Sequence, residues 1–178
     1  MSDLRHGLVL VGMRGAGKTT LGALLAAQLR WPFADTDALL AAAVGEDAGS
    51  HLARVGEAAF RAREEQITRA ALAEEGPQVL ALGGGAVLSP QVRRHLLTSG
   101  HGRVLLLAPL PVLAARIAAA GIARPPLTAL PRAQELELLW QQRRFFYHEV
   151  AELTVDTGAM NADECCRQVL QHFGLLAR

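Results

Sequence analysis

Short apolar segments alternate with longer amphipathic segments along most of the chain. A short apolar run that stops at a turn residue is typical of a strand buried on both faces of a parallel sheet. Strands are therefore predicted over residues 8–11, 33–35, 79–82, 104–107 and 153–155. Between them leucine and alanine recur at helical spacing, which predicts helices over residues 19–30, 37–43, 52–73 with an interruption at Gly56, 90–97, 112–120, 132–150 and 162–173. This alternation predicts an α/β fold with a five-stranded parallel sheet flanked by helices.

Residues 121–131 interrupt the alternation. They include Pro125, Pro126 and Pro131, and prolines at this density favour an irregular loop, which we expect to be mobile. The chain has 178 residues, enough for one hydrophobic core and too few for two independent ones. We therefore expect residues 1–178 to form a single domain.

Composition and charge exclude several classes of protein. Hydrophobic residues make up 51% of the chain and charged residues 20%, which excludes a disordered chain. A formal net charge of +1 gives no electrostatic footprint for nucleic acid or an anionic membrane. Apolar stretches reach seven residues, whereas a membrane span needs about 20, and the N-terminus lacks an apolar signal core. We expect a cytoplasmic protein that binds neither nucleic acid nor membrane.

Cysteine and histidine give no sign of a disulfide or a zinc site. Cys165 and Cys166 are adjacent in a predicted helix, where a bridge between them would be strained, so both are expected to be free thiols. The six histidines are scattered singly, without the spacing of zinc ligands. We expect them at the surface or at helix ends.

The strongest chemical motif is GMRGAGKT at residues 12–19, here called the phosphate loop. It fits the pattern G-x-x-x-x-G-K-[ST] between a predicted strand and a predicted helix. Its glycines allow backbone N–H groups to face phosphate oxygens, and the positive end of the next helix strengthens the field. Lys18, the only lysine among 18 basic residues, would reach the β- and γ-phosphates, and Thr19 would ligate Mg²⁺. The expected nucleotide-binding residues are Gly12, Gly15, Ala16, Gly17, Lys18, Thr19 and Thr20.

Two carboxylates follow the second predicted strand. Asp35 and Asp37 lie two residues apart, at the carboxyl edge of the sheet where open α/β folds bind ligands. One could hold Mg²⁺ through water while the other accepts a proton from an attacking hydroxyl. The alternative is that Asp37 only caps the next helix.

Two further motifs indicate a substrate site. Arg61 and Glu64 are three residues apart, so the carboxylate can orient the guanidinium towards a substrate carboxylate. A solvated surface ion pair is the alternative. Gly83, Gly84 and Gly85 follow a buried strand, which indicates that a ligand approaches the backbone closely or, alternatively, that the chain makes a tight turn. A domain of this length has no room for the additional domains of motors or helicases, and a small phosphoryl-transfer kinase is the simplest function.

These motifs together resemble the shikimate kinase family along most of the chain. The matching segments, in the family's order and spacing, are GMRGAGKTTLG, PFADTD, GEAAFRAREE, VLALGGGAVL, ARPPL and RRFFYHEVAELTVDT. The resemblance implies a nucleoside monophosphate kinase-like fold with a mobile lid at about residues 121–132. It also implies transfer of the γ-phosphoryl group of ATP to the 3-hydroxyl of shikimate, a step towards the aromatic amino acids.

The resemblance further implies roles for individual residues. Asp37 is similar to the residue that contacts and deprotonates the substrate hydroxyl, and Asp35 to the carboxylate on the Mg²⁺ side. Arg124 resembles the lid arginine that reaches the phosphates on closure, and Arg116 lies near the position expected beside adenine. The implied substrate-binding residues are Asp37, Arg61, Gly83, Gly84, Gly85 and Arg143, with the two arginines holding the carboxylate.

Two other functions stay open on the sequence. One is a related small-molecule kinase such as a gluconate kinase, in which the paired substrate arginines and the triple glycine are not expected together. The other is a non-catalytic module that senses a nucleotide or shikimate. The chain carries no appended helix-turn-helix and retains Lys18, Asp37 and Arg124, the expected catalytic residues. We expect a monomer.

Overall fold

The computed structural model describes residues 6–120 and 131–176. Its single sheet has the strand order β2-β3-β1-β4-β5, and every neighbouring pair of strands is parallel. The strands are β1 (Gly7–Gly12), β2 (Phe33–Asp35), β3 (Gln78–Ala81), β4 (Gly102–Leu107) and β5 (Leu153–Asp156). The helices are α1 (Lys18–Leu29), α2 (Thr36–Val44), α3 (Ala48–Val55), α4 (Glu57–Leu72), α5 (Pro90–Thr98), α6 (Leu110–Ala119), α7 (Arg132–Val150) and α8 (Ala162–His172), with a short 3-10 helix η1 at Ala86–Leu88. The predicted α/β sheet is confirmed.

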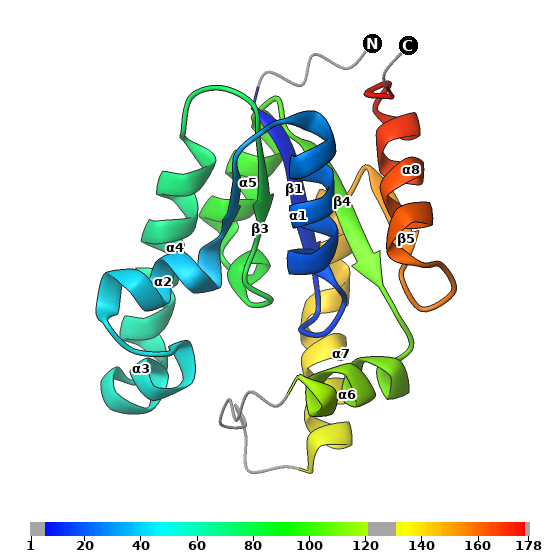
Figure 1. Ribbon diagram of the computed structural model, residues 1–178. Helices are drawn as coiled ribbons and strands as arrows, with labels where there is room; N and C mark the ends of the chain where they lie inside the picture. The colour runs from blue at the N-terminus through cyan, green and yellow to red at the C-terminus, as the bar shows by residue number, and fades with distance from the viewer. Residues whose placement is uncertain (1–5, 121–130, 177–178) are drawn as a thin grey trace.

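The core forms around β1, the central strand. Leu8, Val9 and Leu10 are fully buried, because β3 and β4 pair with the two sides of β1 and helices cover both of its faces. Figure 1 shows α1 in front of the sheet and α5 and α7 behind it, with α8 beside α1. The carboxyl ends of all strands meet at one edge of the sheet, and parallel α/β folds place their ligands at that edge.

Helices α2, α3 and α4 pack against one another beyond β2. The sequence predicted one interrupted helix over residues 52–73, whereas the structure contains two separate helices. Gly56 adopts a φ of 80° between α3 and α4, in the left-handed region that glycine enters at no steric cost. Helix α3 also begins earlier than predicted, because the Asp47 side chain accepts hydrogen bonds from the backbone N–H groups of Gly49 and Ser50.

The cysteine prediction is confirmed, since Cys165 and Cys166 are free and buried. The histidine prediction is wrong at two positions, because His51 and His101 are 7% and 2% exposed.

No helix in the described ranges is both long enough and apolar enough to span a membrane. Arg124 and most of the predicted lid, residues 121–130, lie outside the described residues.

Candidate functional site

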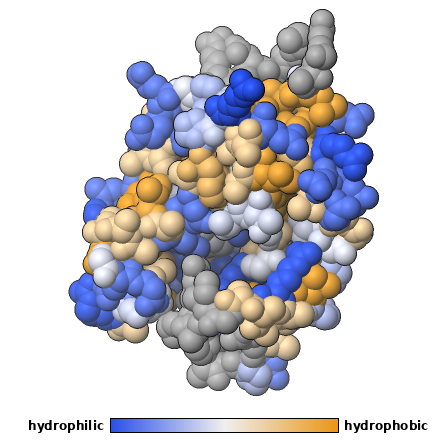
Figure 2. Space-filling model, in the orientation of Figure 1, coloured by the Kyte–Doolittle hydropathy of each residue, from blue (hydrophilic) through white to orange (hydrophobic). Residues whose placement is uncertain are grey.

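A cavity of about 630 Å³ opens at the carboxyl edge of the sheet. The phosphate loop forms its floor, α2, α3 and α4 bound one side, and the loop between β5 and α8 bounds the other. Figure 2 shows the same face hollowed between the α2–α4 group and α1, with hydrophilic surface inside the hollow. The predicted residues that line the cavity are Gly15, Gly17, Lys18, Thr19, Thr20, Asp35, Asp37, Arg61, Gly84, Gly85 and Arg143.

The phosphate loop has the conformation that its glycines predict. Gly15 and Gly17 have φ values of 82° and 92°, and α1 begins at Lys18 directly after the loop. The Lys18 ammonium donates to the carbonyl oxygens of Gly12 and Met13 at 2.9 and 3.0 Å. These contacts hold a positive charge beside the loop and the N-terminus of α1, where backbone N–H groups favour an anion.

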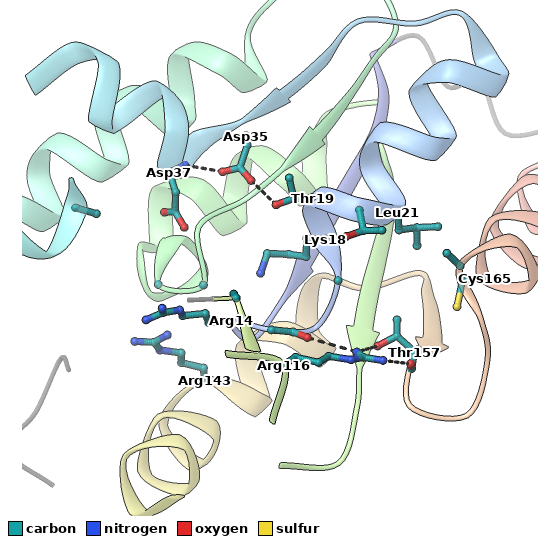
Figure 3. A pocket seen from close by; sticks show the side chains of 18 of the residues that line it. Arg14, Lys18, Thr19, Leu21, Asp35, Asp37, Arg116, Arg143, Thr157 and Cys165 are labelled. Atoms are coloured by element: carbon teal, nitrogen blue, oxygen red, sulfur yellow. Dashed lines mark hydrogen bonds between the residues drawn. The ribbon is translucent and has the colours of Figure 1, made fainter. Parts of the chain in front are cut away.

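Asp35 and Asp37 make different contacts. Thr19 Oγ1 donates to Asp35 Oδ2 at 2.8 Å, and the backbone N–H of Asp37 donates to Asp35 Oδ1 at 2.9 Å. Asp35 is therefore the N-cap of α2, and the alternative in which Asp37 has that role is wrong. Asp37, in the first turn of α2, extends its carboxylate towards the cavity (Figure 3).

The Thr19 and Asp35 oxygens suit a magnesium ion. They are hard oxygen ligands of the kind that Mg²⁺ prefers, and Mg²⁺ is commonly held by one or two protein groups together with substrate phosphates and water. Within the described ranges no group of three or more His, Cys, Asp or Glu residues has metal-binding geometry. The Thr19 hydroxyl and the Asp35 carboxylate, which lie 2.8 Å apart, fit the mode of binding in which phosphates and water supply the other ligands.

The Arg61–Glu64 pair lies in the cavity wall, with the Glu64 carboxylate buried and the Arg61 guanidinium partly exposed. Arg61 Nη1 donates to Glu64 Oε2 at 2.7 Å, and the Glu64 side chain is only 9% exposed. Burial raises the pKa of Glu64, and the charge and hydrogen bond of Arg61 oppose that rise. The alternative of a solvated surface pair is wrong, because the carboxylate is desolvated and fixes the guanidinium at the cavity.

The triple glycine packs tightly against charged side chains. A Cβ atom on Gly83 would overlap Asp37 Oδ1, and one on Gly85 would overlap Arg61 Nη1. At Gly84 it would lie 3.3 Å from Arg143 Nη1. Only glycine therefore allows the two arginines and the aspartate to surround this backbone.

Arg143 and Tyr147 support the same segment from α7. Arg143 is 5% exposed, and Tyr147 is fully buried. The Tyr147 hydroxyl donates to the Gly84 carbonyl oxygen at 2.6 Å. Burial raises the pKa of Tyr147 to about 12, so the hydroxyl keeps its proton and remains a donor at neutral pH.

Three predicted site residues do not reach the cavity surface. Gly12, Ala16 and Gly83 are buried, and their backbone groups are used internally. The Gly12 carbonyl accepts from Lys18, Ala16 N–H donates to Met13 O at 3.2 Å, and Gly83 N–H donates to Thr36 Oγ1 at 2.8 Å. These residues shape the wall and do not present a donor to the cavity.

Arg14 and Thr157 also line the cavity, although neither was assigned a role from the sequence. Arg14 extends from the phosphate loop towards Arg143 in Figure 3. Arg116, placed near adenine by resemblance, donates to Gly15 O at 3.4 Å and to Thr157 Oγ1 at 3.0 Å. Thr157 directly follows β5, and the rule that ligands bind at the carboxyl ends of strands would have pointed to it.

Comparison with known proteins places the chain in a family. The shikimate kinase family model matches residues 14–173. A shikimate kinase of Enterococcus faecalis is 35% identical over 92% of this chain and 96% of its own length. One from Salinispora arenicola is 42% identical, covering 90% of this chain and 93% of the relative.

Solved structures agree with this placement. A shikimate kinase from Acinetobacter baumannii in complex with shikimate has a TM-score of 0.87 and 31% identity, covering 97% of this chain and 94% of that one. A gluconokinase from Sinorhizobium meliloti has a TM-score of 0.61 at 20% identity, a likeness that shows the fold alone. The family model and the relatives together show that this chain belongs to the shikimate kinase family.

Proposed function

We propose that this chain transfers the γ-phosphoryl group of ATP to the 3-hydroxyl of shikimate. The observation that carries the proposal is the arrangement of Arg61, Arg143 and Asp37 around the triple glycine, in the same cavity as the phosphate loop. An anion clamp and a proton acceptor then lie beside the phosphoryl donor. A substrate with a carboxylate and hydroxyl groups on a ring needs both a cationic partner for the carboxylate and an acceptor for the hydroxyl proton.

On the nucleotide side, the backbone N–H groups of the phosphate loop and the start of α1 bind the phosphates. Lys18, held beside the loop by Gly12 O and Met13 O, also reaches the β- and γ-phosphate oxygens and so neutralises charge that develops during transfer. Arg124 has the lid role that the sequence resemblance gives it.

Thr19 and Asp35 would hold Mg²⁺, directly or through water, on the side of the loop that faces the phosphates. The bound ion would neutralise the β- and γ-phosphate oxygens.

On the acceptor side, Arg61 and Arg143 bind the shikimate carboxylate through their guanidinium groups. Glu64 keeps Arg61 in position, and Tyr147 keeps Gly84 in position beside Arg143. Asp37 accepts the proton of the 3-hydroxyl as that oxygen attacks the γ-phosphorus. The enzyme acts as a cytoplasmic monomer in this proposal.

A coupled assay of ADP release tests the proposal. ATP should be consumed with shikimate as acceptor and only at background rate with gluconate, which retains a carboxylate and hydroxyls but lacks the rigid ring. Preferred use of gluconate would support the related small-molecule kinase. Binding of ATP and shikimate without ADP release would support the sensing module. Lys18→Met serves as the inactive control.

A further inference from the structure

Several carbonyl groups of the phosphate loop point away from the cavity and need hydrogen-bond donors from the surrounding protein. Its N–H groups must face the phosphates, so several of its C=O groups point into the protein, and a buried C=O without a partner is costly. Lys18 donates to Gly12 O and Met13 O at 2.9 and 3.0 Å. Arg116 donates to Gly15 O at 3.4 Å, and the Thr157 hydroxyl donates to Ala16 O at 2.9 Å.

Thr157 is held firmly where it makes this contact. It is 8% exposed, and its backbone N–H donates to Leu107 O at the end of β4 at 2.8 Å. Its hydroxyl also lies 3.0 Å from Leu107 O and accepts from Arg116 Nη1 at 3.0 Å. Figure 3 shows the Arg116 side chain reaching Thr157, and its Nη1 also contacts Gly15 O of the phosphate loop. Thr157 therefore connects the phosphate loop to Arg116 of α6 through its hydroxyl, and to β4 through its backbone N–H.

The contact with Ala16 O has a consequence for the nucleotide. A peptide unit is planar and trans, so the carbonyl of Ala16 and the N–H of Gly17 point in opposite directions. Fixing Ala16 O on Thr157 turns the Gly17 N–H away from Thr157. Gly17 lines the cavity with a φ of 92°, and the space beside its Cα is open, since a Cβ there would meet no atom within 4 Å.

We propose that Thr157 is a positioning residue for the nucleotide. Its hydroxyl binds both the Ala16 carbonyl and Arg116, and so orients the Gly17 N–H group for a phosphate while it holds Arg116 at the cavity wall. The threonine does not touch the phosphates itself. This inference rests on the proposed use of ATP, and it goes further by assigning part of the ATP affinity to a residue outside the phosphate loop.

Thr157→Val isolates the hydroxyl. Valine keeps the shape and packing of the side chain but leaves Ala16 O without its donor and Arg116 Nη1 without that acceptor. Arg116 Nη2 still reaches the backbone oxygen of Thr157, so the loop after β5 keeps that anchor. Because an unsatisfied buried group is costly, we expect the dissociation constant and KM for ATP to rise about tenfold or more, with the KM for shikimate within twofold of the parent.

Two further variants separate positioning from a general structural role. Thr157→Ser restores a hydroxyl and should recover most of the ATP affinity. Thr154→Val, on β5 at an exposed position, is the matched control and should leave both KM values unchanged. The melting temperature of each variant is measured alongside, because a purely structural role lowers it without separating the two KM values.

The binding of an ATP analogue without shikimate distinguishes this inference from the proposed function. If the parent protein fails to bind the analogue, the proposed function is wrong. If the parent binds and Thr157→Val binds within twofold of it, the positioning role is wrong. If Thr157→Val does not fold, Thr157→Ala carries the same expectation, and loss of folding in both would assign the hydroxyl a structural role and overturn the proposal.

Discussion

The carboxylate of Asp35 accepts the backbone N–H of Asp37 at 2.9 Å. This hydrogen bond makes Asp35 the cap of α2 and leaves Asp37 to face the cavity. Two carboxylates of the same chemical type, two residues apart, are thereby given different environments. Asp35 accepts a hydrogen bond from Thr19 of the phosphate loop, whereas the Asp37 carboxylate lies against the triple glycine.

Replacement of Asp37 by asparagine should lower turnover much more than it lowers ATP affinity. The substitution keeps the size of the side chain but removes the proton acceptor, and general base catalysis contributes about 10²- to 10⁴-fold to rate. Steady-state kinetics with saturating ATP and shikimate measure the loss. A variant that lost ATP binding yet kept its saturated rate would place Asp37 on the nucleotide side.

Modification of Lys18 should inactivate the enzyme. An amine-directed reagent can react only with this lysine and the N-terminus, and MgATP should protect against the loss. Lys18→Met should lower turnover by about 10²-fold or more, because it removes a charge that stabilises the transition state. Mass spectrometry locates the label, and normal turnover of Lys18→Met would refute the role of the phosphate loop.

Loss of either clamp arginine should weaken the use of shikimate. Arg61→Ala or Arg143→Ala leaves the substrate carboxylate without half of its partners, at a cost of about 2–5 kcal/mol if the site is dry. The KM for shikimate should rise strongly and the KM for ATP should change little. Arg69→Ala is the matched control, since Arg69 lies on the same helix α4 with 53% of its side chain exposed. Equal effects of Arg61→Ala and Arg69→Ala would contradict the clamp.

The stability of the protein should fall in mild acid because of His101. Burial lowers the pKa of His101 to about 4, and His6, His95 and Arg103 add to the effect. The unfolded chain binds the proton near pH 6.5, so between pH 6.5 and 4 it holds more protons than the native state and stability decreases as the pH falls. This residue should cost roughly 3 kcal/mol over that range.

Denaturant unfolding from pH 7 to 4 measures this loss. The variant His101→Gln cannot titrate, and its unfolding free energy should depend less steeply on pH than that of the parent. His148→Gln, at an exposed position, is the control. An unchanged slope for His101→Gln would show that other groups cause the acid sensitivity.

Local patterns were sufficient to predict most of the fold and the phosphate loop. The segment 12–19 carries its own conformational signal, because its glycines and Lys18 act within a few residues of one another. Gly56 was recognised as an interruption of a helix, but whether a glycine bends a helix or ends it depends on packing around α3 and α4. The burial of Glu64 depends on the triple glycine, which lies about 20 residues further along the chain.

Thr157 shows what local patterns miss. Its partners Ala16, Leu107 and Arg116 come from three distant segments, and only the folded sheet brings them together.

The role of Arg124 and the existence of a lid over residues 121–132 stay predictions. The roles of Asp35 and Asp37 were separable only once the capping hydrogen bond was located, because an aspartate at either position can cap a helix.

The most direct test of the account compares shikimate with an analogue that lacks the carboxylate. The site is built around the buried Arg143 and the partly exposed Arg61, which lie beside the triple glycine with Asp37, so kcat/KM for the analogue should fall by about 10²-fold or more, in line with the cost of removing a charge partner from a largely desolvated site. Product analysis should place the phosphoryl group on the 3-oxygen of shikimate. Phosphorylation of the decarboxylated analogue as fast as shikimate would contradict the assignment of Arg61 and Arg143 and with it the proposed substrate.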